Sequence, residues 1–393
     1  MTDEGGPKKR PPAETPIPSE PHSGPELVAC PHCENMVPAG EFCGHCGAHL
    51  TWGVASRQHA FAAVPSEPVV HLSIVSTLFP HLPHRRGGAF RWALLAGVAT
   101  VVILAALHLF APATIAAVFL LPVLYGLYLY EVEVYESEPW LLIGTTMVAG
   151  AILGYVFTIL TGGAVARLAI SGDVGTNFVF AGVVIPIVAQ ALMLAGPVFL
   201  YFFRARLREP LDGLTFGVAS ALGFTFATTL TATWPLLAGP LVGTGSTIDW
   251  ALRLLTAGIL FMLINASTTS VVAAALWLQR YDLRKAGRGW EASLPATVVI
   301  AAGAQVVLGI LAVTVPDLAL QVGLRALAAV AVLMYVRLVI HRSLLAEGAA
   351  HEIGPDAPCP ECHRIVPTMA FCPACGVARA ASKPTRMHAE PRG

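Results

Sequence analysis

Charged residues are scarce in this chain: Asp, Glu, Lys and Arg together make up only 12% of its 393 residues. Soluble globular domains carry about 25%, so the composition points away from an ordinary water-soluble enzyme and toward a membrane protein. The 24 basic and 24 acidic residues balance to a formal net charge of zero. A generally basic surface is therefore missing, and we expect no nucleic-acid partner.

Cysteine is missing from the long apolar middle of the sequence, residues 91–342. All eight cysteines lie in two short clusters, at 30–46 and 359–375. No export signal opens the chain, whose first 25 residues are rich in Pro, Glu and Lys and are predicted to form a disordered tail. Paired Cys-x-x-Cys motifs in such a chain indicate metal sites in a reducing compartment rather than disulfides.

Each cluster consists of two Cys-x-x-Cys pairs separated by nine residues. Two thiolates project from each tight turn, so a short hairpin closes a tetrahedral four-cysteine site around one ion. The alternative is a redox pair, but such a pair usually lies beside a βαβ pattern, which this sequence lacks. We therefore expect two structural Zn2+ ions. The predicted ligands are Cys30, Cys33, Cys43, Cys46, Cys359, Cys362, Cys372 and Cys375.

The two clusters are copies of one module, because a shift of 329 residues superimposes more than the cysteines: Val37 falls on Val366, and Phe42 on Phe371. The pattern resembles the short zinc ribbons at the ends of many bacterial membrane proteins. Ribbons of this kind usually present a small surface to a protein partner. The predicted N-terminal ribbon is 26–50, the C-terminal ribbon is 355–380, and a polar tail follows at 381–393.

The apolar region predicts an all-α polytopic membrane bundle. A hydrocarbon core about 30 Å thick needs roughly 20 apolar residues per helix, and by that measure eight spans fit between 91 and 342, after a linker at 51–90. The predicted spans are 92–110, 113–130, 140–160, 177–203, 213–237, 254–278, 293–315 and 319–341.

The distribution of Lys and Arg between the spans predicts the orientation. If the N-terminus is cytosolic, eleven basic residues flank the cytosolic ends of the spans and two flank the outer ends. The positive-inside rule then places both termini in the cytosol, as the reduced cysteine clusters require. The eleven are Arg85, Arg86, Arg91, Arg204, Arg206, Arg208, Arg280, Arg284, Lys285, Arg288 and Arg342; the two are Arg167 and Arg253.

Part of the bundle resembles the PrsW-type intramembrane proteases, from about 130 to 280. The resemblance rests on three segments: Tyr135-Glu-Ser-Glu-Pro-Trp140, Leu211-Asp-Gly-Leu-Thr-Phe-Gly217 and Ala221-Leu-Gly-Phe224. They are similar to that family's acidic-Pro-Trp entry and to its Asp-Gly…Gly-Phe signature. The resemblance implies a helical membrane fold and a bacterial cytoplasmic membrane.

The same resemblance implies a catalytic site that this sequence lacks. Where active members carry Glu-Glu-x-x-Lys, this chain reads Ala189-Gln190-Ala-Leu-Met193. Thr228 replaces the glutamate of a Phe-x-x-x-Glu motif, and Asn265 aligns with the motif histidine. Gln190, Thr228 and Asn265 cannot act as a carboxylate base or an imidazole ligand, so we expect a non-catalytic relative with no catalytic residues.

Polar and ionisable residues inside the spans have two interpretations. The threonines near 225–233 and the polar run 265–270 either hydrogen-bond neighbouring helices or retain a polar cavity that binds a membrane segment or lipid. Ionisable residues within a bilayer are functional candidates. Those in or near the predicted spans are His108, Arg253, Arg325 and Arg337.

Three hypotheses for function follow from the sequence. The favoured one is a non-catalytic scaffold, in which the ribbons dock a cytosolic protein and the bundle holds a membrane-protein or lipid client. The second is an intramembrane protease that uses other residues. The third is a small-solute transporter, although the spans show no inverted repeat of the kind that transporters often contain.

Overall fold

The computed structural model describes residues 26–50, 65, 88–132, 140–171, 174–203, 210–237, 246–280, 290–348 and 353–379. The two predicted tails and nearly all of the linker at 51–90 lie outside these residues. The same holds for the acidic run before Trp140 and for the arginines of 204–208.

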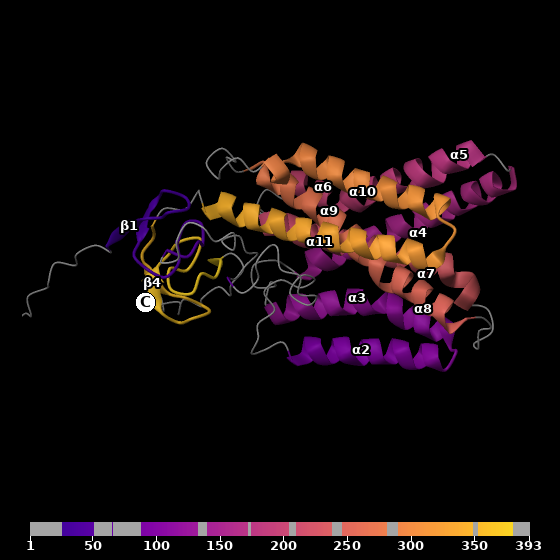
Figure 1. The fold of residues 1–393 in the computed structure, drawn as a ribbon, viewed down its shortest axis with the longest axis horizontal. Coiled ribbons are helices and arrows are strands. Elements are labelled where there is room, and N and C mark those ends of the chain that lie inside the picture. Colours follow the sequence, from indigo (N-terminus) through magenta and orange to yellow (C-terminus); the bar gives the residue numbers. More distant parts are fainter. Residues whose placement is uncertain are drawn as a thin grey trace, which may run out of the picture.

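The middle of the chain is an all-helical bundle (Figure 1). Among the described residues, eight helical stretches are long and apolar enough to cross a membrane, which confirms the predicted fold class. The helices are α2 (Gly88–Ala106), α3 (Phe110–Val132), α4 (Trp140–Ser171), α5 (Val174–Val179), α6 (Ile185–Phe203), α7 (Pro210–Leu237), α8 (Thr247–Leu255), α9 (Phe261–Leu278), α10 (Leu294–Thr314) and α11 (Leu318–Gly348).

Two spans differ in outline from the prediction. The sixth begins at Thr247 rather than 254, because the π-helical turn η4 (Thr256–Leu260) joins α8 to α9 without a break. Arg253 therefore lies inside this span. The first helix ends at Ala106, and His108 adopts a positive φ of 57° in the turn before α3. His108 is thus a turn residue and not a residue of the first span.

Helix α7 lies at the centre of the bundle and packs against α4 and α9. Glycines make the α4–α7 contact close: a Cβ at Gly223 would overlap the backbone of Met147, and one at Gly150 would overlap the backbone of Ser220. Small residues allow helix backbones in a membrane to approach and gain dispersion contacts, since lipid supplies no hydrophobic drive between helices. The bundle is therefore held by close packing around α7.

Each cysteine cluster lies in a small β-hairpin module. Strand β1 (Leu27–Ala29) pairs antiparallel with β2 (Met36–Pro38), and β3 (Asp356–Pro358) pairs with β4 (Ile365–Pro367) in the same register. Gly47 and Gly376 both have a φ of 73°, which glycine adopts without steric cost. The two modules thus have the same local fold.

The two ribbons pack against each other with approximate two-fold symmetry. The backbone N–H of Phe42 donates to the carbonyl of Pro373 at 3.0 Å, and the N–H of Phe371 donates to the carbonyl of Gly44 at 2.9 Å. The 329-residue shift that relates the two copies exchanges these two bonds. Both ribbons lie at one end of the bundle, beside the end of α11 (Figure 1). We call the opposite end of the bundle the distal end.

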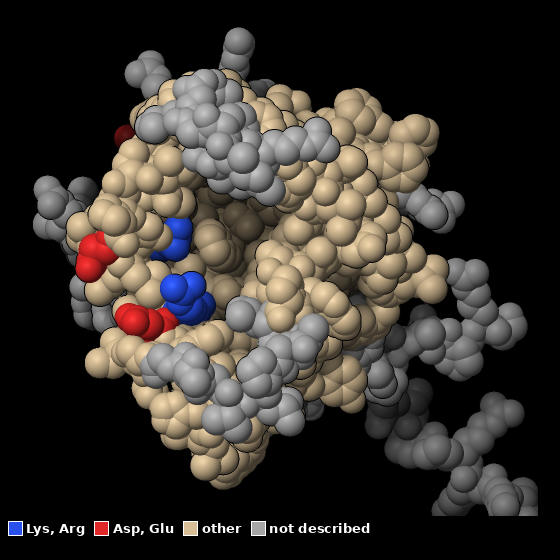
Figure 2. All heavy atoms as spheres, turned by 90° about the vertical axis from the view of Figure 1, so that its right-hand side faces the viewer, with Lys and Arg blue, Asp and Glu red and all other residues tan. Residues whose placement is uncertain are grey.

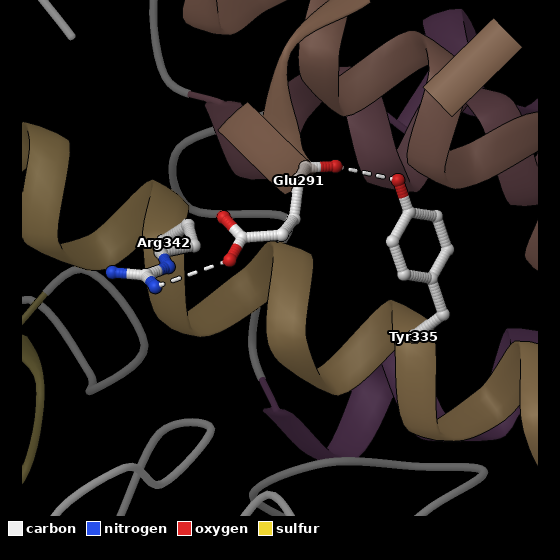
Figure 3. A network of polar contacts seen from close by, with 3 residues as sticks. All are labelled: Glu291, Tyr335 and Arg342. Carbon is white, nitrogen blue, oxygen red and sulfur yellow. Dashed lines mark hydrogen bonds and ion pairs between the residues drawn. The ribbon is translucent and has the colours of Figure 1, made fainter. Parts of the chain in front are cut away.

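The C-terminal ribbon also contacts the bundle. Phe371 is fully buried in an apolar cluster that includes Ile340 and Leu344 of α11. Helix α11 is in turn tied to the short 3-10 turn η5 (Trp290–Ala292) that precedes α10 (Figure 3). There the hydroxyl of Tyr335 donates to the carbonyl of Glu291 at 2.6 Å, and Arg342 approaches the Glu291 carboxylate at 3.7 Å.

Candidate functional sites: two cysteine clusters and a polar cluster in the bundle

The four sulfur atoms of each ribbon converge at distances suited to one ion. In the N-terminal ribbon, Cys30 Sγ lies 3.8 Å from Cys46 Sγ, and Cys33 Sγ lies 3.8 Å from Cys43 Sγ. The corresponding distances in the C-terminal ribbon are 3.8 Å (Cys359 to Cys375) and 3.9 Å (Cys362 to Cys372). A tetrahedron with a zinc–sulfur bond of about 2.3 Å has edges of about 3.8 Å. The residues therefore fit a tetrahedral metal ion.

Hydrogen bonding within each cluster favours a thiolate at one cysteine and a thiol at another. In the N-terminal ribbon a hydrogen bond with Cys33 raises the pKa of Cys46. In the C-terminal ribbon a hydrogen bond with Cys359 raises the pKa of Cys375. Hydrogen bonds from neighbouring thiols, that of Cys43 above all, lower the pKa of Cys33. Hydrogen bonding with Cys359 likewise contributes most to lowering the pKa of Cys372, to about 3. Thiolates are the form that binds soft metal ions. Four sulfurs around one point leave no ligand position open for a substrate, which is the arrangement typical of structural metal sites.

A second group of polar side chains meets inside the bundle, and we call it the polar cluster. Its centre is Gln190 of α6, whose side chain is buried. The Gln190 carbonyl oxygen accepts hydrogen bonds from the Thr268 hydroxyl at 3.0 Å and from the Gln305 amide at 3.1 Å, and its own amide donates to Thr269 at 3.2 Å. The members of the polar cluster are Gln190, Thr225, Asn265, Thr268, Thr269 and Gln305.

Asn265 of α9 extends the polar cluster to α7. Its amide donates to the Thr225 hydroxyl at 2.9 Å, and its carbonyl oxygen accepts from the Gln305 amide at 2.9 Å. The polar cluster thus joins four helices, α6, α7, α9 and α10. Amides both donate and accept, so the six side chains satisfy one another in a region without water.

The structure brings two of the three residues that sequence comparison singled out into one cluster. Gln190 and Asn265 are both bonded to Gln305. Thr228 is not a member, because its hydroxyl donates to the backbone carbonyl of Thr225 on its own helix, at 3.0 Å. Thr225, one turn earlier on α7, faces the polar cluster instead.

Gln305 was missed by sequence reasoning. It is a single amide in α10, a helix whose other residues are apolar, small or threonine. Burying a lone amide in the middle of a span costs free energy unless the amide is hydrogen-bonded. The isolated amide is therefore the sequence signal that could have identified Gln305. The sequence offered no clue to its partners, which lie 37 to 115 residues away.

The chemistry available to the polar cluster is limited to hydrogen bonding. Its donors and acceptors are amides and hydroxyls, which neither abstract a proton at neutral pH nor hold a catalytic divalent metal in the manner of carboxylate or imidazole. Within the described ranges, the groups of His, Cys, Asp or Glu that converge enough to hold a metal are the two four-cysteine clusters. The polar cluster therefore does not fit a metal-dependent hydrolytic site.

Comparison with protein families gives one match. The model described as PrsW family intramembrane metalloprotease matches residues 138–340, just over half of the chain. This segment contains Gln190, Thr228, Asn265 and Gln305. No curated protein and no solved structure matches the chain.

Proposed function

The chain belongs to the PrsW family of intramembrane metalloproteases, and from that premise we propose that it is a non-catalytic member that binds a membrane client without cleaving it. In this proposal the bundle holds the client at the polar cluster. The two ribbons, held together at one end, dock a cytosolic protein. The membrane is the bacterial cytoplasmic membrane, and both termini face the cytosol.

The observation that carries the proposal is the composition of the polar cluster. Gln190 and Asn265 occupy the positions that resemble the family's carboxylate and histidine motifs, and they meet through Gln305. That these two side chains lie together supports a retained binding site. Because they are amides rather than ionisable groups, the base that water activation needs is absent from these positions. In this proposal the polar cluster keeps the position of the family's site and binds a client by hydrogen bonds alone.

Binding without cleavage is physically reasonable for such a cluster. A membrane segment with a locally irregular backbone carries peptide N–H and C=O groups that lipid cannot satisfy. Amide and hydroxyl side chains that already bond one another can exchange those bonds for bonds to a client, at little net cost. The Gln190 and Gln305 side chains are buried, so such exchange requires the helices to separate locally.

The metal content of the purified full-length chain tests the proposal. Two ions per chain, measured by elemental mass spectrometry in detergent, are expected from the ribbons alone. In the same preparation, incorporated into liposomes with a membrane-spanning reporter peptide, we expect no cleavage product. A third ion per chain, together with reporter cleavage that a chelator of that ion abolishes, would overturn the non-catalytic assignment.

A variant separates the polar cluster from the ribbons in this test. Gln190→Ala removes the centre of the polar cluster and is expected to leave two ions bound. Replacing Cys30 and Cys33 by serine is expected to leave one. If Gln190→Ala lowered the metal content, the polar cluster would be a metal site after all.

A further inference from the structure

An arginine lies buried in the distal half of the bundle. Arg325 belongs to α11, seven residues from its start at Leu318, which is about 10 Å along the helix. Only 6% of its surface is exposed. Guanidinium groups stay protonated in proteins, so this is a buried positive charge within a membrane-spanning segment.

The contacts of Arg325 do not neutralise its charge. The guanidinium lies over the ring of Phe261 at 5.0 Å, and Nε is buried without a hydrogen bond. Among the described carboxylates none forms an ion pair with it; Asp317, the nearest in sequence, accepts a hydrogen bond from the N–H of Leu320 at 2.6 Å. A cation–π contact offsets only part of the cost of removing a charge from water. An anion is therefore the missing partner.

A second arginine, which is exposed, lies at a similar distance from the distal end. Arg253 is the seventh residue of α8, a helix that begins at the same end of the bundle and contacts α11. Seen from the distal end, the molecule is hollowed, and basic side chains lie at one side of the hollow with acidic side chains beside them (Figure 2). Arg253 and Arg325 are the basic residues in the distal half whose side chains the structure describes.

We infer that Arg325, with Arg253, binds a phosphate group at the distal end, and that the phosphate belongs to an anionic phospholipid. The planar guanidinium fork matches phosphate oxygens in pairs. Both arginines lie in helices that are long and apolar enough to span a membrane, where phospholipid headgroups supply phosphate.

The phosphate site is adjacent to the polar cluster but distinct from it. Phe261, which covers one face of the Arg325 guanidinium, precedes Asn265 by four residues and therefore lies one turn nearer the distal end on the same side of α9. The Arg325 guanidinium thus lies on the distal side of the polar cluster. The inference rests on the arginines and is independent of whether the polar cluster binds a client.

Native mass spectrometry of the full-length chain tests the phosphate site. The protein is incubated in detergent with equal amounts of phosphatidylglycerol and phosphatidylcholine, and the retained lipid is counted by mass. We expect the wild type to retain phosphatidylglycerol, and Arg325→Gln to retain about tenfold less, as the loss of one charged hydrogen-bonding group implies. The matched control is Arg91→Gln, an exposed arginine at the ribbon end of α2, which is expected to behave like the wild type.

Two conservative variants guard against misfolding of Arg325→Gln. Arg325→Lys keeps the charge without the fork and is expected to retain an intermediate amount of lipid. Phe261→Leu removes the ring beneath the guanidinium and is expected to weaken retention about twofold to fivefold. Equal phosphatidylglycerol retention by Arg91→Gln and by every Arg325 and Phe261 variant that folds would overturn the inference.

Inorganic phosphate distinguishes the two sources of the anion. If millimolar phosphate raises the melting temperature of the wild type but not of Arg325→Lys, and no phospholipid is retained, the ligand is free phosphate at the same site. If phosphatidylglycerol is retained and free phosphate displaces it only weakly, the ligand is the lipid. A wild type that responds to neither would leave Arg325 without a phosphate ligand and refute the site.

Discussion

The ribbons and the bundle are stabilised by different means. Around its own cysteines each ribbon buries little apolar surface, with Val37 and Ala48 in the first copy and Val377 in the second, while Met369 and Phe371 of the second copy are buried against the first ribbon and the bundle. A module this small depends on its metal ion for most of its folding free energy. The bundle depends instead on glycine-mediated contact around α7 and on hydrogen bonds between helices.

The two regions also differ in the chemistry of their sites. Both ribbons keep all four thiols, so the metal-binding residues are unchanged between the two copies. In the bundle, the residues that the family resemblance pairs with ionisable motif positions, Gln190 and Asn265, are amides. Under the proposed function, one chain retains metal-binding residues where the metal stabilises the fold and lacks them in the bundle. This difference makes the two regions separately testable.

The largest expected effect is the loss of a ribbon. Replacing Cys359 and Cys362 by serine removes two ligands, and with them about 10 kcal/mol of metal-dependent folding free energy. Because Phe371 is buried against α11, the C-terminal ribbon should then detach from the bundle and leave the N-terminal ribbon without its neighbour. Elemental analysis, with limited proteolysis of 353–379, measures both effects.

The matched variant replaces Cys30 and Cys33. It should also lose one metal ion, but the C-terminal ribbon should keep its contact with α11 and stay resistant to protease. In both variants we expect the melting of the bundle to change little. A bundle that unfolded along with either ribbon would break the distinction between the two regions.

An intermediate effect is expected within the bundle. Gly223→Ala places a methyl group against the backbone of Met147 and should destabilise the α4–α7 contact by about 1–3 kcal/mol. Gly144→Ala on α4 is the control, since a Cβ there meets open space. Unfolding in denaturing detergent, followed by circular dichroism, measures the difference, and both variants should retain two metal ions.

The smallest expected effect concerns the polar cluster. Gln305→Leu removes hydrogen bonds to Gln190, Asn265 and Thr268 and should cost roughly 1–2 kcal/mol, since each interhelical hydrogen bond in a membrane contributes about 0.6 kcal/mol. Thr228→Val removes only a bond within its own helix and should change stability by less than about 0.5 kcal/mol. Equal effects of the two variants would mean that the polar cluster does not join the helices.

The eight spans and the cysteine sites could be predicted because their signals are local. A span is a run of about 20 apolar residues, and the four ligands of a ribbon lie within 17 residues of sequence. The end of the first helix was harder to predict, since Leu107 and His108 carry apolar and aromatic character but form a turn. The hydropathy of a segment does not predict the residue at which its helix ends.

The composition of the polar cluster could be predicted only in part. Family resemblance pointed to Gln190, Thr228 and Asn265, and the structure brings two of these, Gln190 and Asn265, together. On α7, the Thr225 hydroxyl accepts from Asn265, whereas the Thr228 hydroxyl donates to a carbonyl of its own helix. The pairing of the ribbons was open at the sequence level, because its contacts join segments 329 residues apart.

The pairing of the ribbons has a consequence for biosynthesis. The first ribbon leaves the ribosome more than 300 residues before its counterpart, and at 5–20 residues per second the delay is on the order of tens of seconds. During that time the edge formed by Phe42 and Gly44 has no partner within its own chain. Neighbouring ribosomes on one messenger would present the same edge, so slow insertion of the spans favours exchange of ribbons between nascent copies.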